Sequence, residues 1–223
     1  MLEISEAFKR YQKRVEEGSD FVWGQRHDID PCIHALEYSI LLHVGQELCD
    51  WVFEGRTARE ISDQYTAPPN DPIGGKALWV KGAMERLDAH ADLITRDRIM
   101  AFCGAMCAQA LARDNIESTR AELQQFDSLD AYWASKGFHE GILYNTYHPC
   151  EVTKTRCYCL GNGLPPGETM SPTYCRCAVG HSQYLCDVHG LPVKVELLHS
   201  ALCGADECRF EFRILSDGKS KSK

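Results

Sequence analysis

The sequence predicts an α+β fold in which a helical N-terminal half is followed by a smaller α+β unit. Two patterns indicate this. Up to residue 137, apolar residues recur at spacings of three and four, as on one face of a helix, without strand-like alternation. Beyond about residue 140, short β-prone segments surround one further helix, and two of them alternate apolar and polar residues. We therefore expect a helical region at 1–137, a cysteine-rich α+β region at 138–215 and a flexible basic tail at 216–223.

The helices are predicted from their periodicity and their caps. The first is a short amphipathic helix at 1–17. Asp30 followed by Pro31 marks the start of the next, because Asp caps free backbone amides and Pro is tolerated at the first helical position. From there one apolar stripe, Ile33 to Trp51, predicts a single helix to about Gly55, which could pack within the chain or against a second copy in a homodimer. Further helices are expected at 57–65, 76–93, 96–113 and 128–136.

The C-terminal elements follow a change of pattern at Gly137. Short β-prone segments are expected at 141–147 and 151–159. Ser171 before Pro172 predicts a capped helix that ends at Gly190. The alternating segments 192–198 and 209–214 are expected to pair as a hairpin, with Val193, Val195 and Leu197 on one face of the first strand and Phe210, Phe212 and Ile214 on one face of the second.

Composition and charge exclude several classes of partner. The formal net charge of −8 argues against a nucleic-acid or anionic-membrane partner, since both need a basic face. The chain contains no run of about 18 apolar residues, so we expect no membrane span. The N-terminus lacks the apolar stretch of a signal peptide. Twelve cysteines are then better explained as reduced thiols or metal ligands than as disulfides, which predicts a cytoplasmic location.

Two Cys-x-Cys pairs dominate the C-terminal region. Residues two apart in a strand point to the same face, so Cys157 and Cys159 could present two thiolates to one ion. Residues two apart in a helix diverge by about 200°, so we expect only one of Cys175 and Cys177 to face such a site. A thiolate in the first turn of a helix is favoured by the backbone amide dipoles, which suits a metal ligand or a nucleophile.

A second pair of cysteines lies in the helical half. Cys103 and Cys107 share one helical face, so they could complete the C-terminal site or form a reactive pair. The same residues also fit an ordinary apolar stripe. In either case Gly104 between them indicates close backbone packing, because glycine costs helix stability. Cys32, Cys49 and Cys186 are expected to be core residues.

The metal is predicted from the softness of the donors. Thiolate and imidazole favour zinc, an iron–sulfur cluster or copper(I) over magnesium or calcium. We expect zinc, with an iron–sulfur cluster as the alternative. The predicted hairpin contributes further donors, among them His199 at the end of its first strand. The complete set of candidate ligands is Cys103, Cys107, Cys157, Cys159, Cys175, Cys177, His199, Cys203 and Cys208.

A set of features lies between Thr173 and Phe212: Cys175, Gly180, Leu191-Pro192-Val193 and Gly204-Ala205-Asp206-Glu207-Cys208-Arg209-Phe210. In these features the stretch resembles the 4-vinyl-reductase domain family, whose members are small-molecule-binding domains of bacteriochlorophyll biosynthesis proteins and phenol-sensing transcription activators. The resemblance implies that Cys175 and Cys208 bind zinc and that His199 stands where the sensors have another cysteine, with Cys203 as the alternative to His199. It also implies a small organic ligand.

Two further resemblances keep other functions open. The segment IMAFCGAMC together with the two Cys-x-Cys pairs is similar to a cysteine-rich bacterial family with a helical N-terminal half. The C-terminus also resembles the L-2-amino-thiazoline-4-carboxylate hydrolases.

The first hypothesis is a zinc-containing small-molecule-binding domain protein. The second is a hydrolase that uses a metal-bound water or a thiolate, for which Cys175, His199 and Cys208 fit a three-ligand catalytic zinc. The third is an iron–sulfur or redox protein.

Overall fold

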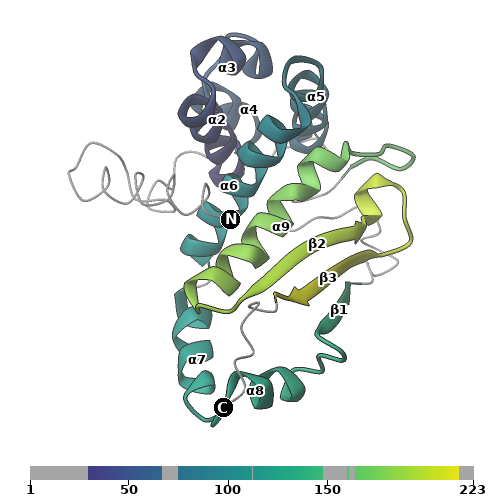
Figure 1. Cartoon of the computed structure of the whole chain (residues 1–223). Helices are drawn as coiled ribbons and strands as arrows, with labels where there is room; N and C mark the ends of the chain where they lie inside the picture. Colours follow the sequence, from purple (N-terminus) through teal and green to yellow (C-terminus); the bar gives the residue numbers. More distant parts are fainter. Residues whose placement is uncertain (1–29, 67–74, 112, 148–159, 161–163, 216–223) are drawn as a thin grey trace, which may run out of the picture.

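A computed structural model describes residues 30–66, 75–111, 113–147, 160 and 164–215, and its elements confirm the α+β class. Helices α2 to α8 come first and are followed by three strands and one long helix (Figure 1). Their bounds are α2 Pro31–His43, α3 Gln46–Phe53, α4 Ala58–Thr66, α5 Gly75–His90, α6 Leu93–Leu111, α7 Arg113–Leu123, α8 Leu129–Ser135, β1 Ile142–Tyr147, α9 Pro172–Val188, β2 Val193–His199, the 3₁₀ turn η3 Ala201–Cys203 and β3 Cys208–Ile214. The helix expected at 1–17, the β segment at 151–159 and the basic tail lie outside the described residues.

Local capping explains where α2 and α9 begin. The carboxylate of Asp30 accepts hydrogen bonds from the backbone N–H groups of Cys32 and Ile33, at 2.9 and 3.2 Å. The hydroxyl of Ser171 accepts one from Thr173 at the start of α9. Both caps confirm the sequence prediction, because each needs only a polar side chain followed by a residue that tolerates the first turn.

The single helix predicted from Pro31 to about Gly55 is wrong. The chain breaks into α2 and α3 at Gly45, whose φ of 124° is readily adopted only by glycine. Val44 and Trp51, which belonged to the predicted apolar stripe, are 50% and 55% exposed. Trp51 instead stacks on His90 of α5, with ring centroids 4.6 Å apart. The sequence prediction also missed α7, whose polar sequence carries little apolar periodicity.

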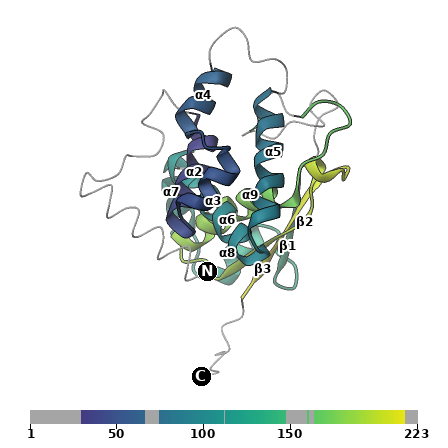
Figure 2. The same cartoon turned by 90° about the horizontal axis from the view of Figure 1, so that it is seen from above.

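The three strands form one antiparallel sheet in the order β1-β3-β2. The predicted β2–β3 hairpin is confirmed, with Val195 opposite Phe212 and η3 in the connection. Helix α9 packs along the sheet, as the two views of Figures 1 and 2 show. Gln183 of α9 also satisfies the free edge of β2, because its side chain donates to the carbonyl of Val193 at 2.8 Å and accepts from the N–H of Val195 at 3.0 Å. An exposed strand edge is thereby covered.

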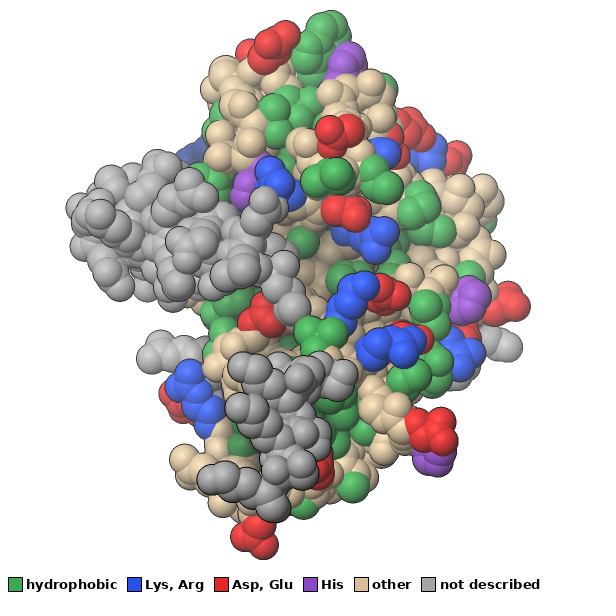
Figure 3. All heavy atoms as spheres, viewed as in Figure 1, with side chains coloured by type: hydrophobic (Ala, Val, Ile, Leu, Met, Phe, Trp, Pro, Cys, Tyr) green, Lys and Arg blue, Asp and Glu red, His purple; other side chains and the backbone are tan. Residues whose placement is uncertain are grey.

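The other face of the sheet carries charges of both signs. Arg213 donates two hydrogen bonds to Glu211 on β3, and Lys194 pairs with Glu196 on β2. Figure 3 shows acidic and basic side chains interspersed over the viewed face of the molecule. None of the described helices has the length and apolar character needed to cross a membrane.

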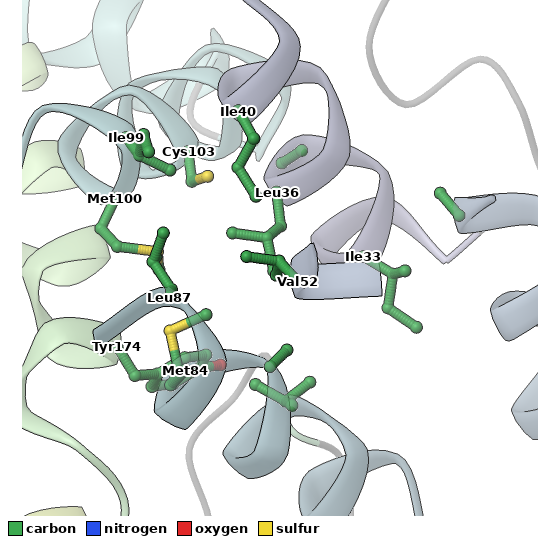
Figure 4. Close-up of a cluster of buried hydrophobic side chains, with 14 of the residues drawn as sticks. Ile33, Leu36, Ile40, Val52, Met84, Leu87, Ile99, Met100, Cys103 and Tyr174 are labelled. Carbon is green, nitrogen blue, oxygen red and sulfur yellow. The ribbon is translucent and has the colours of Figure 1, made fainter. Parts of the chain in front are cut away.

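Two hydrophobic clusters make up the core. The larger one is built mainly from α2, α3, α5 and α6 (Figure 4), and it also includes Tyr174, Cys175 and Leu202 from beyond residue 137. The smaller one joins Tyr132 and Trp133 of α8 to the apolar faces of β2 and β3. All the described strands lie beyond the boundary expected at residue 137, together with α9, while the larger cluster draws side chains from both sides of it.

Helices α6 and α9 form the most extensive helix–helix contact of the described residues. A Cβ added at Gly104 would lie 1.8 Å from the carbonyl oxygen of Cys177, and one at Gly180 would lie 2.1 Å from the carbonyl oxygen of Ala101. The two backbones therefore touch where these glycines cross. This confirms the close packing predicted for Gly104, and it fixes α9 against the helical half.

Candidate functional site

The candidate site lies where the start of α9 meets the β2–β3 connection. Cys175 belongs to the first part of α9, and Cys203 is the last residue of η3. Their sulfur atoms are 4.0 Å apart, and the Sγ of Cys175 is 3.0 Å from the Oγ of Ser200. Three polarizable or polar atoms from two segments are thereby gathered at one point.

The backbone of the connection holds these groups in place. The N–H of Met170 donates to the carbonyl of Leu202 at 2.8 Å, and the Leu202 side chain is buried. Gly204 ends η3 with a φ of 98°, a conformation that favours glycine. The N–H of Ala201 points at the Sγ of Cys208, 3.4 Å away, so the first residue of β3 also directs its sulfur toward η3.

Cys175 and Cys203 differ in their protonation. The hydrogen-bond contact between the sulfurs of Cys175 and Cys203 lowers the pKa of Cys203 to about 6, with a further contribution from Ser200. The same hydrogen bond and burial raise the pKa of Cys175. The contact therefore favours a pair that holds one proton, with the negative charge favoured on half-buried Cys203 over buried Cys175.

The geometry of this pair fits two ligands of a soft metal ion. Sulfurs bound to zinc at about 2.3 Å in a tetrahedral arrangement lie about 3.8 Å apart, close to the 4.0 Å observed between Cys175 and Cys203. The Sγ of Cys208, which accepts from the N–H of Ala201, is the next sulfur directed at the same connection. Within the described ranges, no group of three or more His, Cys, Asp and Glu side chains is placed to hold a metal ion. Cys157 and Cys159, the other predicted donors, lie outside those ranges.

The remaining C-terminal candidates occupy different surroundings. Cys177 is half-buried on α9 and packs against the larger cluster. His199 is exposed at the end of β2, opposite Arg209 and just after a register shift that follows Leu197. Cys186 is half-buried against the smaller cluster, and burial raises its pKa to about 12, as expected for a thiol that serves as packing.

Cys103 and Cys107 belong to a separate group of thiols. Cys103 is buried in the larger cluster between α2 and α6, beside Ile40 and Ile99 in Figure 4. Burial raises the pKa of Cys103, and the nearby thiols of Cys32 and Cys107 raise it further. This placement agrees with the core interpretation of Cys103. Cys49 is likewise buried, with a pKa raised to about 12 mainly by burial, as predicted for a core residue.

Two features of the site were not found from the sequence. Ser200 carries no local signal, since it becomes a partner of Cys175 only through a contact across 25 residues. Asp88 of α5 is the other. It accepts hydrogen bonds from the hydroxyls of Ser171 and Thr173, at 2.5 and 2.6 Å, and from Arg96 at 2.5 Å. These contacts anchor the start of α9, and hence Cys175, to the helical half.

Comparison with known proteins gives one match. A family model described as a family of unknown function (DUF6144) matches residues 54–218, well over half of the chain and including the whole candidate site. Searches of curated proteins and of solved structures give no match.

Proposed function

The chain belongs to the DUF6144 family, and because that family has no known function, we propose one from the site itself. We propose that Cys175 and Cys203 are ligands of a soft metal ion, zinc in the first place, that fastens α9 to the β2–β3 connection of a small-molecule-binding domain. The observation that carries the proposal is the 4.0 Å separation of the two sulfurs, which is close to the edge of a zinc–thiolate tetrahedron.

The chemistry of the surroundings supports thiolate ligation. A metal ion replaces the proton that the pair shares, since thiolate rather than thiol is the ligand. Cys208 is the next donor in the proposal, because the Ala201 N–H is directed at its sulfur from within the same connection. Cys157 and Cys159 remain sequence-based candidates for the other positions. Zinc held in this way would supply a rigid cross-link between segments far apart in the sequence.

The ligand class and location come from other arguments. The resemblance to 4-vinyl-reductase domains supports a small organic ligand. All nine cysteines among the described residues are free thiols, which supports a reducing, cytoplasmic location.

Thiol-dependent hydrolysis is the second candidate function. One feature of the site favours it: the contacts of half-buried Cys203 with Cys175 and Ser200 lower the pKa of Cys203, which favours its thiolate. A thiolate of this kind is a competent nucleophile. An iron–sulfur cluster is the third candidate, because it would use the same sulfur donors.

Metal content and an optical spectrum of protein purified without oxygen test these alternatives. We expect the wild type to contain about one zinc per chain and to be colourless. Cys175→Ser and Cys203→Ser should lose the zinc. The control Cys186→Ser, which changes another cysteine of α9, should keep it. Cys208→Ser should also lose zinc and destabilise the C-terminal unit, because metal binding and folding are coupled. Iron with sulfide and absorption near roughly 400 nm would establish the cluster instead. A metal-free protein would contradict the proposed centre and leave thiol chemistry.

A further inference from the structure

Cys203 and Cys175 have the arrangement of a peroxide-sensitive dithiol. We propose that a hydroperoxide oxidises Cys203, that Cys175 then condenses with it to form a disulfide, and that this reaction expels the bound metal. The disulfide follows from the geometry of the two cysteines alone. The expulsion of metal deepens, and rests on, the proposed function.

The separation of the sulfurs makes the disulfide accessible. A disulfide bond is about 2.05 Å long, so the two sulfurs, now 4.0 Å apart, must approach by about 2 Å. Cys203 lies in a single 3₁₀ turn that ends at Gly204. Such a connection can shift locally at far less cost than the strands that flank it. Cys175 is fixed on α9, so the movement is assigned to η3.

The different burial of the two cysteines sets the order of events. Cys203 is half-buried, whereas the Cys175 residue is only 8% exposed. A hydroperoxide therefore reaches the sulfur of Cys203 first. The sulfur of Cys175 is in contact with that of Cys203, so Cys175 is the resolving thiol. Its position protects Cys203 from further oxidation to the sulfinic acid.

The chemistry balances with a hydroperoxide as the only oxidant. The sulfur of Cys203 attacks the outer peroxide oxygen, the O–O bond breaks, and the products are a sulfenic acid and an alcohol, or water from hydrogen peroxide. The sulfur of Cys175 then attacks that of Cys203 and loses its proton, and the hydroxyl leaves as water. Two thiols are oxidised by two electrons to one disulfide, and the peroxide is reduced by the same two electrons. A small dithiol reductant reverses the reaction by thiol–disulfide exchange.

Oxidation and metal binding compete for the same atoms. A disulfide sulfur is no longer a thiolate, so formation of the bond removes two proposed ligands at once. The covalent link then takes over the attachment of η3 to α9. The site would thus pass between a metal-fastened and a disulfide-fastened form.

Peptide mapping of the full chain after hydrogen peroxide treatment tests the inference. The zinc-loaded and the chelator-treated protein are each oxidised, blocked with an alkylating agent, digested without reductant and analysed by mass spectrometry. We expect a disulfide-linked peptide containing Cys175 and Cys203 in the wild type. Cys175→Ser should stop at a Cys203 sulfenic acid that dimedone traps, and Cys203→Ser should form no link to Cys175. Cys186→Ser should behave as the wild type.

Zinc release, followed with a chromogenic chelator, separates this inference from the proposed function. Release of zinc in step with the disulfide supports both. A Cys175–Cys203 disulfide in a protein that binds no zinc supports the dithiol and contradicts the metal centre. A zinc-loaded protein in which Cys203 is overoxidised, or linked to another cysteine, overturns the dithiol while the metal centre stands. Mapping of the wild type decides this even if a variant fails to fold.

Discussion

At the scale of single residues, the environment of each cysteine sorts the thiols into two chemical classes. Burial raises the pKa of Cys49 and Cys186 to about 12, so these thiols stay protonated and act as small apolar side chains. Cys203 differs because its sulfur is in hydrogen-bond contact with a neighbouring thiol, which lowers its pKa, and because it is half-buried rather than enclosed. Reactivity in this chain therefore depends on position within the fold, which explains why a count of cysteines alone does not locate the site.

The lowered pKa of Cys203 predicts its alkylation profile. Only the thiolate reacts, so in chelator-treated protein the rate of Cys203 modification by iodoacetamide should rise with pH through a midpoint of about 6, against about 8.5 for an unperturbed thiol. Cys175→Ala should move the midpoint upward, since it removes the hydrogen-bond donor. Mass spectrometry of quenched samples gives the rate at each cysteine, with Cys186 as the slow internal control. A wild-type midpoint near that of a free thiol would contradict the shared proton.

Sequence reasoning reached part of the site at this scale. Cys175 was a candidate because it lies near a helix start, and the family resemblance pointed to Cys175 and Cys208 as ligands, with Cys203 as an alternative to His199. Ser200 was out of reach, because its contact with Cys175 depends on the exact position of η3. The placement of His199 was equally unpredictable, since a register irregularity after Leu197 decides where its side chain points.

At the scale of elements, the crossing of α6 and α9 joins the helical half to the site. Gly104 and Gly180 bring the two backbones together, and an ion pair between Asp97 and Arg176 at 3.1 Å spans the same interface. Helix α9 carries both Gly180 and Cys175, so the crossing also determines the position of Cys175. Small residues at a crossing are the means by which two helices approach more closely than ordinary side chains permit.

Substitution of a crossing glycine should therefore destabilise the protein. In Gly104→Ala the new methyl meets backbone atoms of Cys177 and His181 that cannot rotate away. Overpacking of this kind costs about 1–3 kcal/mol or more, and the helix-propensity gain of about 1 kcal/mol offsets only part of it. We expect a melting temperature lowered by roughly 4–8 °C, as a loss of about 2 kcal/mol gives in a chain of this size.

Gly82→Ala is the matched control. It lies within α5, where the added methyl would meet the guanidinium of Arg86 at 3.0 Å, a side-chain end that also contacts Val52 and Glu54 and has to yield by only a few tenths of an ångström. Its melting temperature should stay the same or rise slightly. Equal destabilisation by the two substitutions would show that the α6–α9 crossing is not the cause.

Asp88 gives a second prediction for elements. Burial alone would raise its pKa, but hydrogen bonds from Ser171, Thr173 and Arg96 outweigh burial and lower it. The stability that its ionised form contributes is therefore present above the unfolded pKa of about 3.9 and is lost as the pH falls through the lower folded value. Asp88→Asn should cost about 1–2 kcal/mol near pH 7, because it weakens hydrogen bonds to a charged group.

Denaturant unfolding at several pH values checks this prediction. The difference between the wild type and Asp88→Asn should shrink below about pH 4. Glu85→Gln, which removes only a surface pair with Lys81, should change stability by less than about 1 kcal/mol at any pH. A constant difference across the pH range would mean that the charge of Asp88 is not what anchors α9.

How far the sequence predicts each element depends on the range of the interactions that form it. The caps at Asp30 and Ser171 and the strand alternation are local, and all were predicted. The break at Gly45 was missed because the apolar stripe continues through it, and only packing decides that α3 turns away. The pairing of β1 with the far edge of β3 is equally long-range. Neither a cap nor a period carries that information.

At the scale of the whole molecule, α9 belongs to both hydrophobic clusters. Tyr174 and Cys175 near its start lie in the larger cluster, while Ala178 and Val179 pack against the smaller one. Leu197 of β2 contacts both. Helix α9 therefore packs against the core of both the helical and the strand-containing region. Two clusters that share an element are expected to lose it together.

We accordingly expect one cooperative unfolding transition. Trp79 lies in the larger cluster and Trp133 in the smaller one. The sequence has two further tryptophans, Trp23 and Trp51, so in a background that replaces both by Phe, Trp133→Phe and Trp79→Phe each leave a single fluorescent reporter in the other cluster. Loss of either cluster would remove packing that holds α9. In each variant the fluorescence of the remaining reporter and the helical circular dichroism should therefore give the same midpoint, and the two variants should agree. Clearly separated midpoints would show that the α6–α9 crossing is not strong enough to couple the clusters. In that case chelation of the metal should lower both transitions, since Cys175 belongs to the larger cluster, Cys203 packs against it, and Cys208 packs against the smaller one.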